Sequence, residues 1–381
     1  MTKGTRVVVK REIYEWAIKE SQKDFEEIKA KFNKIEDWIV QNSHPTFRQL
    51  EKLANYLKVP FGYMFLDKPP KTNVIDAEFR RIGDKIPNMS KSLKDTIYDM
   101  SRKQNWISEY RKVNGWNKVI PDSFSDLDKS DYFEFAKKAK DFLDLDEYWY
   151  NDFKDNRIAY NFLRDKIENK GMLVMQSGIV GTNTHRKLDI NEFRGFMLYD
   201  DLAPLIFINT NDSQAGKIFT LIHEYIHILL REDDVFFDAD LDNKLEKEVN
   251  SITAEFLMPK SHIETLWDED DKSLNQIEKI SKVFNVSKLS LAIRLRELGL
   301  IEQHLVNKVI NLTEKDLKNK LRNSNGGDYY NTIKSRYSRN FLETVILGAE
   351  SGDISYTYAF KLLDVKGKTY DVLKERMMNY G

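Results

Sequence analysis

Residues 223–227 of this 381-residue chain read His-Glu-Tyr-Ile-His, inside the apolar run 219–230. Side chains four positions apart in a helix lie on one face, one turn from each other, so His223 and His227 can direct both imidazoles at one ion. Glu224 follows the first histidine, where its carboxylate can hold a water against that ion and accept its proton. The apolar residues around the motif predict a buried helix with the histidine pair at the rim of a core.

This pattern fixes only three residues and can also occur by chance. It would then belong to a core helix whose histidines each have a hydrogen-bond partner. The chain has only six histidines, so two at this spacing with a glutamate between them are less easily incidental. No cysteine is present, which leaves histidines and carboxylates as zinc ligands. A chain without disulfides also suits a reducing compartment.

A catalytic zinc with two histidines and a water needs one more protein ligand. One class of such sites continues with a glycine and a third histidine, but Leu230 and Asp233 occupy those positions, which excludes that class. The remaining common solution is a carboxylate on a second helix, and residues 245–259 carry an apolar stripe that ends at a proline. The candidates there are Glu246, Glu248 and Glu255.

Glu248 is the favoured candidate of the three, because it lies next to the apolar stripe and one turn before Ile252. Spacing alone does not decide among them, since glutamates on most helices are only solvated charges. A further donor normally steadies the oxyanion of a peptide-bond hydrolysis. The chain offers several residues for that part, and none is assigned: Arg194, His185, Tyr225 and His262.

Three stretches around this site share a known pattern: Phe219–His227, Glu248–Asn250 and Ala254–Pro259. Together they resemble the ImmA/IrrE family of metallopeptidases, with mild departures at Val249, Ile252 and Thr253, where the family has Ala, Phe and Ala. The resemblance implies that His223, His227 and Glu248 bind Zn²⁺ and that Glu224 is the general base.

The resemblance further implies a selective bacterial metalloendopeptidase whose protein substrates are often transcriptional repressors. Such an enzyme would act in phage, mobile-element or stress regulation. Two other classes stay open: a DNA-binding regulator whose zinc is structural or sensory, and a toxin–antitoxin or phage-defence component. A structural or sensory site would have no use for the base at Glu224, which is not a ligand.

The length of the chain predicts two or three domains. We expect a degenerate helix-turn-helix domain of the XRE type at 1–70, a helical connecting region at 71–155, a metallopeptidase domain at 156–301 and a C-terminal helical domain at 302–381. The expected fold class is α+β and predominantly helical, with a zincin-type core that contains a small sheet. The absence of a signal peptide or an apolar span predicts a cytoplasmic protein with no membrane partner.

Short runs of β-forming residues predict the strands of that sheet at 172–175, 193–198 and 205–209. Asp212 or Ser213 would cap the motif helix that follows. Peptidases of this kind bind an extended substrate along an edge strand, but the pattern does not say which strand that is.

The N-terminal segment resembles helix-turn-helix domains through residues 45–60, and such domains often precede this kind of peptidase. Arg48 and Lys52 are its candidate DNA contacts. The formal charge of the chain is −1, and residues 1–70 hold only a small excess of basic residues, a thin footprint for phosphate contacts. DNA binding and protein docking are therefore both open for this domain.

Overall fold

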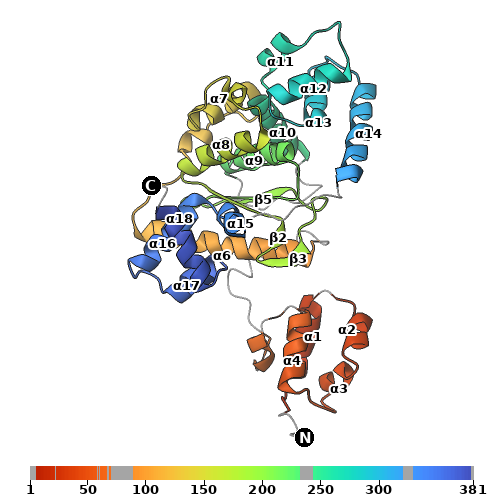
Figure 1. Cartoon of the computed structure of the whole chain (residues 1–381), viewed down its shortest axis with the longest axis vertical. Helices are drawn as coiled ribbons and strands as arrows, with labels where there is room; N and C mark the ends of the chain where they lie inside the picture. The colour runs from red at the N-terminus through yellow and green to blue at the C-terminus, as the bar shows by residue number, and fades with distance from the viewer. Residues whose placement is uncertain are drawn as a thin grey trace. The chain divides into compact units, whose positions relative to one another are not determined.

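The computed structural model describes residues 6–21, 23–57, 59, 61–66, 68–69, 89–231, 243–320 and 329–378. The chain divides between Lys94 and Asp95 into two compact units, each described here by itself (Figure 1). Residues 71–88, at the start of the expected connecting region, lie outside the described residues. The boundaries expected near 155 and 301 fall inside the second unit, so the division into four domains stays a prediction.

The first unit is helical. Its elements are α1 (Arg11–Ser21), α2 (Phe25–Lys31), α3 (Ile35–Ile39), α4 (Phe47–Leu57) and the 3-10 helix η1 (Phe61–Phe65). Asp24 begins α2 by accepting hydrogen bonds from the backbone of the first turn, including one from Glu26 N at 2.8 Å. Fully buried side chains such as Ile13 and Leu50 give this unit its own core. Its resemblance to helix-turn-helix domains stays a prediction.

The second unit contains a mixed three-stranded sheet in the order β1-β5-β4, built from β1 (Leu173–Ser177), β4 (Gly195–Leu198) and β5 (Leu205–Asn209). β5 is parallel to β1 and antiparallel to β4. The three expected strands are therefore present, with ends shifted by up to two residues. A separate hairpin, β2 (Ile179–Val180) with β3 (Asn183–Lys187), was not among the expected strands.

Helices make up most of the second unit. They are α6 (Lys91–Val113), η2 (Asp122–Phe124), α7 (Tyr132–Phe142), η3 (Trp149–Asp152), α8 (Asn156–Asn169), α9 (Gln214–Leu229), α10 (Asn243–Leu257), α11 (Lys260–Leu266), α12 (Leu274–Val283), α13 (Lys288–Glu297), α14 (Gln303–Lys320), α15 (Tyr329–Arg336), α16 (Arg339–Glu350), α17 (Tyr356–Leu362) and α18 (Gly367–Met378). The described chain is thus α+β and predominantly helical, as predicted. None of its described helices is both long and apolar enough to span a bilayer.

The sheet of the second unit lies between two layers of helices (Figure 1). Helices α8 and α9 pack on one face, whereas α6 and the C-terminal helices lie on the other. Gln104 of α6 donates hydrogen bonds to the carbonyl oxygens of Leu198 and Ala203, at 2.8 and 3.0 Å. These bonds fix α6 to the end of β4.

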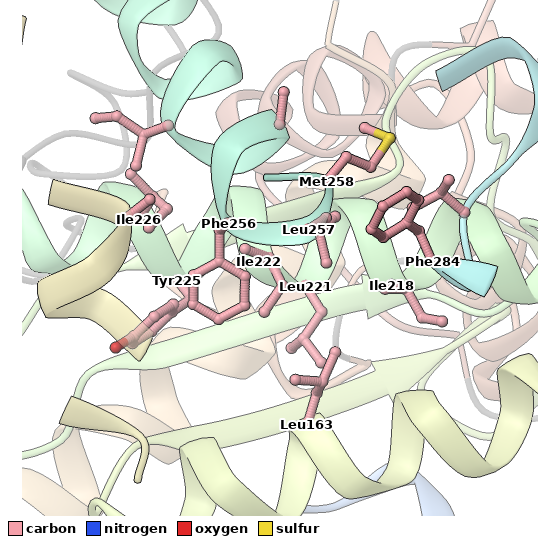
Figure 2. Packing of buried hydrophobic residues seen from close by; sticks show 14 of the residues in the cluster. Leu163, Ile218, Leu221, Ile222, Tyr225, Ile226, Phe256, Leu257, Met258 and Phe284 are labelled. Atoms are coloured by element: carbon pink, nitrogen blue, oxygen red, sulfur yellow. The ribbon is translucent and has the colours of Figure 1, made fainter. Parts of the chain in front are cut away.

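The main core of this unit surrounds α9 (Figure 2). Leu221, Ile222 and Tyr225 are fully buried there and pack toward Phe256 of α10. The Tyr225 hydroxyl donates a hydrogen bond of 2.9 Å to the carbonyl oxygen of Ala139 in α7. Because buried residues hold α9 on most of its circumference, the side chains at its remaining face have a fixed position.

Candidate metal centre

Helix α9 carries the two histidines of the sequence motif. Ser213 caps the helix by accepting a 3.0 Å hydrogen bond from Gly216 N, which selects the second of the two expected caps. The Nε2 atoms of His223 and His227 face each other at 3.0 Å. Their side chains are 16% and 7% exposed, so the pair lies at the edge of the core and reaches solvent on one side only.

Helix α10 adds a carboxylate to this pair. Glu246 places one oxygen 3.5 Å from Nε2 of His223 and the other 3.3 Å from Nε2 of His227. Ligand atoms 2.0–2.1 Å from a tetrahedral zinc lie about 3.3 Å from each other. The observed contacts are close to that value, although Glu246 makes them with two different oxygens. With one ligand atom taken from each residue, the three atoms lie within 4.8 Å of one another. Among the described residues, this is the group of His and acidic side chains close enough to share an ion.

The structure brings Glu246, and not the favoured Glu248, to the histidines. The Glu248 carboxylate lies 3.7 Å from Lys244 Nζ, and its side chain is 13% exposed. Glu255, the third candidate, forms a buried ion pair with Arg294 of α13. The apolar stripe could not separate Glu246 from Glu248, because α10 is buried almost all round from Ile252 onward and so offers no single inward face.

The charge states of His223 and Glu246 suit a divalent metal. Burial, with a smaller contribution from neighbouring His227, lowers the pKa of the His223 imidazole to about 4. The hydrogen bond from His227 is the main reason why the pKa of the Glu246 carboxyl lies below its ordinary value. At neutral pH His223 is therefore uncharged and Glu246 ionised, the forms in which these residues bind zinc.

The other nitrogen of His223 points into the protein. Its Nδ1 is buried and has no hydrogen-bond partner of good geometry, although the Asn250 side chain lies beside the ring. Asn250 stands one turn after Glu246 on α10. Histidines that bind a metal usually donate their second N–H to such a neighbour, which fixes the ring and the tautomer. No role was predicted for Asn250, although its spacing of four from Glu246 is the signal that marks it.

Glu224, the expected general base, is 9% exposed and lies close to the start of β4. A Cβ on Gly195 would lie 3.4 Å from Glu224 Cγ and only 2.5 Å from Thr220 Cγ2. Strand β4 therefore approaches α9 at the level of Glu224 only because residue 195 is glycine. A glycine inside an apolar strand often marks such a close approach, and this is the signal by which Gly195 could be found in the sequence.

The four residues named as oxyanion donors lie in different surroundings. Tyr225 is bonded to the backbone of α7, and His262 is bonded to Tyr150 Oη at 2.7 Å and to Glu147 at 3.1 Å. Arg194 pairs with Asp212 at 2.7 Å beside the start of α9. His185 lies on the exposed hairpin strand β3. None of these contacts directs a donor at the histidine pair.

The two candidate DNA contacts belong to the first unit. Arg48 and Lys52 are both exposed and stand one turn apart on α4. Helix α3 exposes Glu36 and Asp37 in its first turn, where its N-terminus would otherwise favour an anion. The structure thus places the two basic residues on one helix, and DNA binding by them stays a prediction.

Comparison with known protein families finds a match to part of the chain. Residues 168–296 match the sequence model of a peptidase family, M78, that is described as an IrrE N-terminal-like domain. This segment runs from the end of α8 to α13 and includes the sheet, the histidine pair and Glu246. The segment is similar to ImmA/IrrE-type peptidases, and the match supports a metallopeptidase-type function for the second unit. No curated protein and no solved structure matched the chain.

Proposed function

We propose that the second unit is a zinc-dependent endopeptidase in which His223, His227 and Glu246 hold the metal and Glu224 is the general base. The observation that carries this proposal is the set of separations of 3.0, 3.3 and 3.5 Å among the three ligand residues. When bound at such a site, zinc lowers the pKa of a coordinated water and polarises the substrate carbonyl.

Glu224 supplies the proton transfers of this reaction. Its carboxylate accepts a proton from the water that attacks the peptide carbonyl carbon, and delivers that proton to the nitrogen as the C–N bond breaks. It follows His223 directly on a helix whose other faces are buried, so its position is fixed by the same packing that fixes the ligands. A purely structural or sensory site would not need this residue.

Strand β4 is the proposed docking site for the substrate backbone. It lies at one edge of the sheet and contacts α9 through Gly195, beside Glu224. At the far end of β4, the carbonyl oxygen of Leu198 already accepts a hydrogen bond from Gln104. The substrate backbone would therefore pair with the first residues of the strand. An extended peptide that pairs there passes the general base.

The proposed substrate is a specific protein, a transcriptional repressor in phage, mobile-element or stress regulation. The support for this class is the peptidase segment together with the resemblance of the first unit to repressor domains. Recognition of an extended segment along β4 also requires a substrate with a loop or linker that can be pulled into strand form.

The test uses the purified full chain, Glu224→Gln and, as a matched control, Glu248→Gln. Zinc content is measured by mass spectrometry, and cleavage is measured as new N-termini in a proteome-derived peptide library. We expect about one zinc per chain in all three proteins, and new N-termini with the parent and Glu248→Gln only. Cleavage by Glu224→Gln equal to that of the parent would refute the role of the base. If the parent protein holds no zinc after it has been loaded with the metal and dialysed, the proposed metal site is refuted.

A further inference from the structure

Three phenylalanine rings of the first unit form a cluster on its surface. Phe47 at the start of α4 lies 4.8 Å from Phe61, and Phe61 lies 5.1 Å from Phe65, both as ring-centroid distances in edge-to-face pairs. The ring centroids of Phe47 and Phe65 are 6.1 Å apart. Phe47 is nevertheless 54% exposed and Phe65 48% exposed. We call these three residues the aromatic surface.

The aromatic surface is not needed to complete the core of this small unit. That core is formed by fully buried residues such as Ile13, Leu50 and Leu53. Only Phe61 of the three rings also packs against it. Contiguous apolar surface that a domain keeps in water marks a binding site more often than single exposed residues do. Two of the three ring pairs are already edge-to-face, so the rings would lose little side-chain entropy when a partner binds.

The charges beside this surface restrict the partner. Arg48 and Lys52 follow Phe47 on α4, and neither forms an ion pair with any residue that the structure describes. Glu51, one turn after Phe47, reduces the rim of α4 to an excess of one positive charge. A second copy of the chain in a two-fold pairing would bring the same basic residues toward each other. For nucleic acid, an excess of one positive charge on α4 provides few phosphate contacts.

We infer that the first unit is a docking module for a protein segment that inserts apolar side chains among Phe47, Phe61 and Phe65 and directs Asp or Glu toward Arg48 and Lys52. Apolar side chains supply most of the affinity, and the carboxylates set the orientation and the salt dependence. The inference does not depend on the proposed hydrolysis, because it concerns binding by the other unit.

The experiment uses the full chain in a Glu224→Gln background, so that no bait is cleaved. A phage-displayed library of random 16-residue peptides is selected on this protein alone, and every enriched peptide is then measured on Phe47→Ser/Phe65→Ser. Both residues are about half exposed, so the double variant keeps its core, and circular dichroism confirms the fold. Leu347→Ser, at a 60% exposed leucine of the second unit, is the matched control.

We expect enriched peptides that combine Leu, Ile, Phe or Trp with Asp or Glu. Their affinity, measured by fluorescence anisotropy, should fall at least about tenfold in Phe47→Ser/Phe65→Ser, remain unchanged in Leu347→Ser, and fall with salt. Arg48→Glu/Lys52→Glu should weaken the same peptides, which gives a second variant that leaves the rings intact.

Other occupants give different results, each of which overturns the inference. Peptides that bind the double variant as well as the parent would exclude the aromatic surface as the binding site. Enriched peptides without acidic residues would exclude the proposed acidic partner. A gel shift of a 30-base-pair random duplex that requires Arg48 and Lys52 identifies the surface as a DNA contact. A parent that is dimeric by light scattering, with a monomeric Phe47→Ser/Phe65→Ser, identifies a second copy as the occupant.

Discussion

Glu246 and Glu248 stand two residues apart at the start of the same helix, yet only the Glu246 carboxylate reaches the histidine pair. Two positions correspond to a rotation of about 200° around a helix axis, so the two side chains point to nearly opposite sides. The Glu246 carboxylate lies within 3.5 Å of both imidazoles, whereas the Glu248 carboxylate lies near Lys244. A metal site on two helices therefore depends on the rotation of the second helix as much as on its sequence.

Glu246→Gln should lower zinc affinity by more than about 100-fold, because it replaces a charged ligand, whereas changes behind a ligand typically cost 10–100-fold. Glu248→Gln should change it little. Competition with a chromogenic chelator measures both values. The reverse ranking would return the third ligand to Glu248, and equal losses would mean that neither carboxylate is a dominant ligand.

Much of the second unit follows from local pattern. The three strands, a cap at Asp212 or Ser213 and the buried motif helix were all predicted, because alternation, capping and helical spacing act over a few residues. Which carboxylate lies beside the histidine pair was not predictable in this way. It depends on how α10 is rotated against α9, which is decided by packing between segments far apart in the chain. The same holds for the contact of Gly195 with α9, which only the assembled sheet creates.

Gly195→Ala should reduce cleavage strongly while zinc is retained. The added Cβ would lie 2.5 Å from Thr220 Cγ2 and 2.9 Å from the carbonyl oxygen of Phe207, so β4 or α9 must shift. Overpacking of this kind costs about 1–3 kcal/mol of the free energy of unfolding. Urea unfolding and cleavage rates measure the two effects.

Gly348→Ala is the control for that variant. The nearest atom to its added Cβ is 3.7 Å away, within a helix, so the substitution should stabilise the protein by about 0.5–1 kcal/mol and leave cleavage unchanged. A Gly195→Ala variant that cleaves like the parent would show that β4 tolerates displacement and is not the substrate strand.

Arg164→Leu should detach the C-terminal helices from the sheet. This buried guanidinium donates hydrogen bonds to the carbonyl oxygens of Val174, Ser335 and Tyr337 at 2.6–2.9 Å, and pairs with Glu168. Its loss leaves a buried carboxylate uncompensated, at a cost of about 3–5 kcal/mol. Thermal unfolding and limited proteolysis near residue 329 would reveal both effects.

The exposed pair of Arg339 and Glu343 offers the comparison, because Arg339→Ala should cost less than about 1 kcal/mol. If Arg164→Leu behaves like Arg339→Ala, the C-terminal helices are held by apolar packing alone.

Lys217→Met should stabilise the protein at pH 7 and lose that advantage in alkali. Burial is the main reason why the pKa of the Lys217 ammonium falls from 10.5 to about 8. Below pH 8 the lysine is charged in both the folded and the unfolded chain, and the folded chain bears the full desolvation cost, about 1–3 kcal/mol. Between pH 8 and 10.5 the folded chain releases its proton first, so the stability of the parent rises toward that of the variant.

Urea unfolding of parent and Lys217→Met at pH 7 and pH 10 measures this difference, with the exposed Lys308→Met as control. A stability gap that is equal at the two pH values would contradict the shifted pKa.

Asn250 is the remaining test of how the site is held. If its side-chain oxygen orients the buried Nδ1 of His223, Asn250→Ala should lower zinc affinity about 10–100-fold while the fold is kept. Asn250→Asp keeps an acceptor oxygen and should restore most of that affinity. A merely structural role predicts the opposite order for these variants, because a new charge next to a buried ring would disturb packing more than a truncation. Zinc competition and urea unfolding on the same samples separate the two roles, and equal zinc affinity in Asn250→Ala and the parent would leave His223 oriented by α9 alone.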